Sequence, residues 1–182
     1  INSFKENRYK GENENLICEI IRKDSLNEFI SYVKENKYSL ESCVKQSIFE
    51  TNSFLIDQKE VTLIEYAAFF GSIQIFDYLY KCSVGINKSI WMYAIHGNNE
   101  KIIQILNNKN TKLYENDMYK IYYSKSEFDA DYDSANHYSY ILQKAISSER
   151  CIIEAIKCHH NDIANYIAHN FITNCKEIIL IG

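Results

Sequence analysis

The residues that could perform chemistry gather toward the C-terminal end of the chain, where thiols and imidazoles are densest. Zinc prefers sulfur and imidazole ligands, and a structural zinc site needs four donors arranged as a tetrahedron. The usual short ligand pairs are missing, since the closest pair is His159-His160, whose adjacent side chains diverge on a helix. We therefore favour packing roles for the cysteines and predict no metal, while a Cys/His-dependent metal-binding regulator remains an alternative. The cluster comprises Cys151, Cys158, His159, His160, His169 and Cys175.

A second group with ligand chemistry is the acidic stretch from Asp129 to Asp133, where carboxylates alternate as in the first half of a calcium loop. A calcium loop needs a glycine next and a bidentate glutamate at its end. Ser134 and Tyr140 stand at those two positions instead. We interpret this stretch as a solvated acidic loop and expect no cofactor.

Sequence signatures of enzymes are missing from the chain. It contains no glycine-rich phosphate loop, no nucleophile elbow and no paired-carboxylate motif, and its five glycines leave little room for a backbone anion cradle. A catalytic Cys–His pair meets in space rather than in sequence, so a small enzyme of that kind stays open as an alternative. The expectation is that the protein is not an enzyme.

Composition excludes several classes of partner. The net charge of −4, the isoelectric point near 5.8 and the scattered basic residues argue against nucleic acid. No apolar run approaches the roughly 20 residues that cross a bilayer, so no membrane association is expected. Six cysteines without CxxC pairs favour reduced thiols and a cytoplasmic location. The absence of proline and the scarcity of glycine favour an all-α fold, and the length of 182 residues indicates one domain or two small ones.

Helices must position these residues, and apolar spacing predicts them from the N-terminus onward. Residues 1–13 form a frayed or partly helical lead-in, and Leu16–Arg22 and Ser25–Asn36 are helices with apolar stripes. Ser42–Glu50 is predicted as a further helix and Thr51–Glu60 as a loop or short extended link. We expect residues 1–61 to form a helical region that caps the stack of helices after residue 61.

The most clearly marked stretch is Thr62–Tyr80, which reads as a complete helix–turn–helix unit. Thr62 can cap the first helix, and Glu65 can reach back to the backbone N–H of the cap. Gly71 is expected to end the first helix and Ser72 to begin the second.

This unit recurs along the chain. Laying Ala67 on Ala94, an offset of 94 − 67 = 27, places Asn98 on Gly71, and asparagine is the usual replacement for glycine at a left-handed helix stop. A looser third copy appears when Ala155 is laid on Ala67. The predicted repeats are 62–88, 89–106, a degenerate 107–149 and 150–173, followed by a C-terminal tail, all within one continuous domain with the N-terminal region.

The segment TLIEYAAFFGSIQIFDYL resembles the ankyrin repeat. Thr62, Ala67 and Gly71 match the ankyrin pattern, whereas Leu63 occupies the position where the family has proline. The chain is similar to the divergent ankyrin-repeat proteins expanded in parasitic protists. The resemblance implies an ankyrin-like α-solenoid with short or missing β-hairpin fingers. It also implies that His159-His160 is a helix stop and cap.

The same resemblance implies that the protein is a non-catalytic scaffold or adaptor, monomeric or weakly self-associating, that binds a protein partner through its concave face. Aromatic side chains are typical of such interfaces, but the same rings could pack between repeats, and the sequence leaves both interpretations open. A purely architectural segment of a longer repeat array is a further alternative. The positions carried over to the concave face are Tyr66, Phe69, Phe70, Tyr93, His96, Gly97, Glu154, Lys157 and Cys158.

Overall fold

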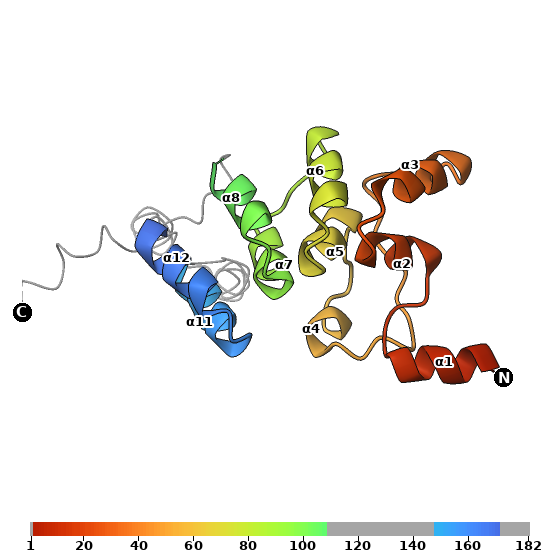
Figure 1. Ribbon diagram of the computed structural model, residues 1–182, viewed down its shortest axis with the longest axis horizontal. Helices are drawn as coiled ribbons and strands as arrows, with labels where there is room; N and C mark the ends of the chain where they lie inside the picture. The colour runs from red at the N-terminus through yellow and green to blue at the C-terminus, as the bar shows by residue number, and fades with distance from the viewer. Residues whose placement is uncertain (1, 109–147, 172–182) are drawn as a thin grey trace, which may run out of the picture. The chain divides into compact units, whose positions relative to one another are not determined.

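The computed structural model describes residues 2–108 and 148–171, and every structural statement below concerns those ranges (Figure 1). Within them the chain is helical, and its only β-type pairing is an isolated antiparallel bridge between Cys43 and Thr62. The predicted all-α class is therefore confirmed for the described part of the chain. The acidic loop at 129–133, Cys175 and nearly all of the predicted degenerate repeat lie outside the described residues.

Two compact units divide the chain, Ile1–Gln104 (unit 1) and Ile105–Gly182 (unit 2), and each is described by itself. None of the helices in the described ranges is both long and apolar enough to cross a membrane. The predicted division at residue 61 stays a prediction.

Unit 1 arranges its helices in layers, which Figure 1 shows from top to bottom. In the middle layer α5 contacts both α2 and α7; in the layer above, α3 contacts α6. Within each helix pair, α2 also packs on α3 and α5 on α6. Helices α1 and α4 lie on the opposite side of the middle layer. The bounds are α1 (Asn2–Lys10), α2 (Leu16–Arg22), α3 (Leu26–Glu35), α4 (Ser53–Ile56), α5 (Leu63–Phe69), α6 (Ile73–Lys81) and α7 (Ile90–Gly97), and α8 (Glu100–Asn108) begins in unit 1 and continues past its last residue.

The same type of turn joins the two helices of each helix pair in both units. The first or second residue after the first helix has a positive φ, and its N–H donates to the carbonyl three residues back. In three of the four turns the next N–H donates to the carbonyl five residues back. This is the Schellman pattern that ends helices in the left-handed conformation. It confirms the predicted stops at Gly71, Asn98 and His159, and it confirms a turn at Asp24, between the helices predicted at Leu16–Arg22 and Ser25–Asn36. The four positions are Asp24 (φ 49°), Gly71 (67°), Asn98 (47°) and His159 (59°).

Helix α5 is the centre of unit 1, because all seven of its residues are buried. Its predicted capping box is confirmed: Thr62 Oγ1 accepts from the N–H of Glu65 at 3.3 Å, and Glu65 Oε2 accepts from the N–H of Thr62 at 2.9 Å. The other oxygen, Oε1, accepts from the hydroxyl of Ser89 at 2.7 Å. Ser89 therefore joins two successive pairs instead of capping its own helix.

The turn before α3 also caps α6. Asp24 accepts hydrogen bonds from the N–H groups of Gln74 and Ile75, one on each carboxylate oxygen, at 3.0 Å. Ser72 occupies the N-cap position of α6, but its hydroxyl donates to the carbonyl of Ile21 at 2.6 Å. A carboxylate from the preceding pair thus satisfies the orphan N–H groups of this helix.

The prediction of a helix over Ser42–Glu50 is wrong. The backbone there pairs with residues distant in sequence: Val44 donates to the carbonyl of Val61 at 2.7 Å, and Leu63 donates to that of Ser42 at 3.2 Å. Its apolar residues form no buried stripe, since Ile48 is 85% exposed. The following link contains the four-residue helix α4, which the sequence did not predict.

In unit 2, α11 (Ser148–Lys157) and α12 (Asn161–Phe171) pack against each other through the turn at His159. Cys151 and Ala155 on α11 and Ile163 and Ile167 on α12 are buried. The predicted third helix pair is therefore present.

Candidate binding surface

Most of the aromatic residues carried over from the sequence belong to one cluster on the lower side of the middle layer, and α4 covers part of it. The ring of Phe54 stacks on Phe69 with centroids 5.8 Å apart, meets Tyr93 edge-on at 5.1 Å and lies 4.2 Å from the imidazole of His96. Phe69 also packs on Phe70 at 5.0 Å. One side chain of α4 therefore bridges α5 and α7.

The structure buries three of the predicted contact residues. Tyr66 is 1% exposed, Phe69 8% and Tyr93 3%. A partner on the surface of unit 1 cannot reach these rings, so burial favours the packing interpretation that the sequence left open. Phe70 and His96 are half-buried and remain within reach.

The hydroxyl of Tyr66 belongs to a polar group that sequence reasoning did not identify. Tyr66 Oη accepts from Arg22 Nη1 at 2.7 Å, and Arg22 Nε pairs with Glu12 at 3.1 Å. The guanidinium lies 5.8 Å from the ring centre of Phe70, a cation–π distance. Burial raises the pKa of Tyr66 above its usual range, so the hydroxyl stays protonated at neutral pH. The sequence contains a signal for this group: when Asp24 is aligned with Gly71, Arg22 takes the position of Phe69, which the sequence analysis assigned to the binding face.

Of the carried-over residues of unit 2, Glu154 and Lys157 lie on α11 and Cys158 directly follows it. Lys157 is exposed and its ammonium pairs with Glu154 at 3.2 Å, a surface ion pair of the kind that contributes little to stability. Cys151 on α11 is fully buried, and burial raises its pKa to about 12. A thiol held protonated in this way is a poor metal ligand.

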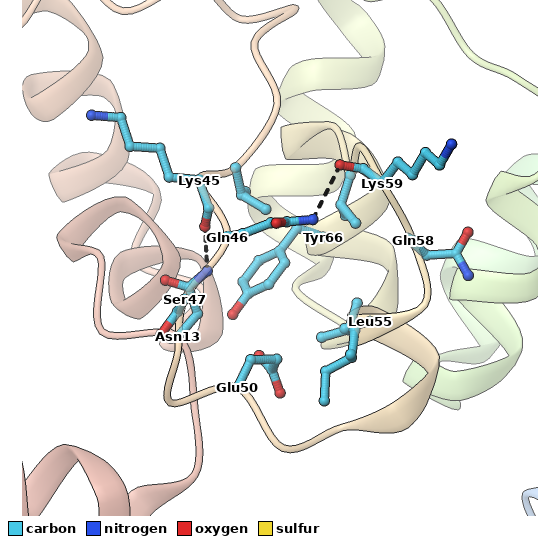
Figure 2. A pocket seen from close by; sticks show the side chains of 12 residues that line it. Asn13, Lys45, Gln46, Ser47, Glu50, Leu55, Gln58, Lys59 and Tyr66 are labelled. Atoms are coloured by element: carbon cyan, nitrogen blue, oxygen red, sulfur yellow. Dashed lines mark hydrogen bonds between the residues drawn. The ribbon is translucent and has the colours of Figure 1, made fainter.

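A small pocket opens between the segment 44–61 and α5 (Figure 2). Its volume is about 130 Å³. Apolar walls come from Val44, Leu55 and Val61. Figure 2 shows the ring of Tyr66 at the back and the carboxylate of Glu50 below it.

Comparison with known proteins places the chain in no family: no family model, no curated protein and no solved structure matches it. Arguments about function therefore rest on the geometry described above.

Proposed function

We propose that this protein is a non-catalytic interaction module, built as an ankyrin-like α-solenoid that binds a protein partner. The observation that carries the proposal is the recurrence of one turn after the first helix of each pair. Its positions are separated by 71 − 24 = 47, 98 − 71 = 27 and 159 − 98 = 61 residues. Unequal spacing with unchanged turn geometry is what divergent repeats with insertions produce.

Packing in unit 1 supports the repeat interpretation. First helices contact first helices, second helices contact second helices, and Asp24 and Glu65 each hydrogen-bond into the next pair. A helix pair that depends on its neighbour for burial and for capping is the unit from which solenoids are built. Such stacks expose long surfaces. These surfaces can bind a partner, and binding needs no catalytic residues.

The partner surface we propose differs from the one that the resemblance alone implies. Because α4 covers Phe69 and Tyr93, the available aromatic positions are the half-buried Phe70 and His96 at the margins of α4. Glu154 and Lys157 remain proposed contacts in unit 2. Five free thiols among the described residues support the proposed cytoplasmic location.

The test is affinity capture with the purified chain, followed by calorimetry with each protein that is captured. The double variant Phe70→Ala/His96→Ala should weaken a specific partner at least tenfold, because truncated interface anchors commonly cost more than 1 kcal/mol. Tyr9→Ala is the matched control, since Tyr9 is the most exposed aromatic residue on α1. A reproducible turnover, a stoichiometric bound metal, or a partner indifferent to the double variant would overturn the proposal.

Burial of Tyr66 favours the purely architectural role as the second candidate. In that case Tyr66→Ala with Phe70→Ala lowers the free energy of unfolding and leaves every captured partner bound as tightly as before.

A further inference from the structure

The pocket beside Tyr66 has a restricted size. An apolar cavity of about 150 Å³ holds one benzene molecule, whereas sites for drug-sized ligands measure about 300–1,000 Å³. At about 130 Å³ the pocket has room for roughly five or six non-hydrogen atoms and none for a nucleotide or similar cofactor. Its capacity matches a single extended side chain.

Glu50 gives this pocket an acceptor with bonding capacity left. One carboxylate oxygen of Glu50 accepts from the N–H of Asn52 at 2.9 Å, and no described residue donates to the other. The amide nitrogen of Gln46 donates to the carbonyl of Lys59 at 3.5 Å (Figure 2). Asn13 is already committed, since its amide donates to the carbonyl of Lys45 at 2.7 Å.

The nearby cations do not occupy or close the site. Lys45 and Lys59 line it with their inner atoms, and Figure 2 shows both ammonium groups directed away from it. The charge of Arg22 is paired with Glu12. The pocket thus offers an anionic acceptor at one end and apolar walls along its length.

We propose that this pocket receives one lysine or arginine side chain of the protein partner. The cationic head binds Glu50, and the methylene chain lies against Val44, Leu55 and Val61. Charge-assisted hydrogen bonds are the stronger kind, and an alkyl chain gains from apolar walls, so this class of side chain satisfies both parts of the pocket. The inference rests on the proposed function, because it assigns a specificity element to the partner.

The experiment titrates the full chain with doubly blocked amino acids, N-acetyl-lysine and N-acetyl-arginine N-methylamides, and follows backbone amide signals by NMR. Blocked norleucine is the neutral match for lysine, and blocked glutamate is the anionic one. We expect saturable shifts confined to residues 44–61 and the vicinity of Tyr66. Norleucine should bind at least tenfold more weakly than lysine, and glutamate should not bind.

Two variants complete the test. Glu50→Gln should weaken lysine binding roughly tenfold or more, whereas Glu28→Gln on the exposed face of α3 removes the same charge elsewhere and should leave it unchanged. Equal binding of lysine and norleucine, binding of blocked glutamate, or indifference to Glu50→Gln would overturn the assignment. Binding of free butylammonium without blocked lysine would also overturn it, since the site would then take small amines. These titrations need no partner, so they can fail while capture of a partner succeeds, and the reverse.

Discussion

Gly97 and Ala68 bring the backbones of α7 and α5 into direct contact. A Cβ placed on Gly97 would lie 2.0 Å from the carbonyl oxygen of Ala68, far inside van der Waals distance. A Cβ on Gly71 would in turn lie 2.8 Å from the carbonyl oxygen of Gly97. The close approach of α7 to α5 therefore depends on the absence of a side chain at position 97.

Replacing Gly97 by alanine should force these two helices apart. We expect the free energy of unfolding to fall by at least about 2 kcal/mol, as for other substitutions that overfill a packed site. Urea denaturation followed by the fluorescence of Trp91, the single tryptophan and fully buried in α7, measures the change in unit 1.

The matched control is Gly85→Ala, because a Cβ at that position meets no atom within 4 Å. It should change stability by less than about 0.5 kcal/mol or raise it slightly. If Gly97→Ala were as harmless as Gly85→Ala, the close approach of the two backbones would be wrong.

The cap that Asp24 provides to α6 gives a second prediction. Asp24→Asn keeps a residue that tolerates the left-handed conformation, yet it places an amide donor against one of the two N–H groups. Stability should drop by about 1–2 kcal/mol, the range for losing a helix cap together with a charge at a helix N-terminus.

Asp57→Asn makes the same chemical change at the exposed C-terminal end of α4 and serves as the reference. The two substitutions are compared by the midpoint of the same Trp91 unfolding curve. Equal midpoints would show that Asp24 does not hold α6.

Local signals were read correctly from the sequence because each operates within a few residues. Thr62 and Glu65 lie three apart and cap one helix end, and the stops at Gly71 and Asn98 depend on their own φ. The helix predicted at Ser42–Glu50 failed because its backbone bonds with Val61 and Leu63, partners that its own periodicity does not reveal.

The candidate site was only partly predictable for the same reason. Phe69 and Tyr93 stood out as aromatic positions, but Phe54 covers both rings, and it comes from a helix of four residues without a sequence periodicity. The likeness between the turns at Asp24 and Gly71 was not recognised in the sequence, because the long 37–61 segment separates the two helix pairs.

Phe54 provides the third prediction, since its ring covers Phe69 and Tyr93. Phe54→Ala should uncover both rings and raise the fluorescence of an added hydrophobic dye. The free energy of unfolding should fall by about 1–3 kcal/mol, less than for a fully buried phenylalanine because Phe54 is half-buried.

Phe4→Ala is the control for this change, because Phe4 is about half-exposed and its ring packs on Phe49 instead. It should leave dye binding near the level of the unsubstituted chain. Comparable dye binding by the two variants would mean that α4 does not shield the α5 and α7 rings.

The buried thiol of Cys18 predicts how stability responds to alkaline pH. Burial raises its pKa from 9.0 to about 12, so above pH 9 the unfolded chain loses a proton that the folded chain keeps. Stability is therefore fully present below pH 9 and declines as pH rises, by about 1 kcal/mol between pH 9 and pH 10 for this group. The raised pKa values of Tyr66 and Tyr93 add to the decline from about pH 10, the ordinary value for tyrosine.

Removing the thiol separates its contribution from those of the tyrosines. Cys18→Ala should lower stability at pH 7, because it leaves a small cavity, yet flatten the decline between pH 9 and pH 10. Cys82→Ala, at an exposed position on the end of α6, should change the stability at pH 7 and the slope between pH 9 and pH 10 much less than Cys18→Ala does. Urea denaturation at closely spaced pH values, followed by Trp91 fluorescence, measures the slopes. A slope in Cys18→Ala as steep as in the unsubstituted chain would place the alkaline titration at another group.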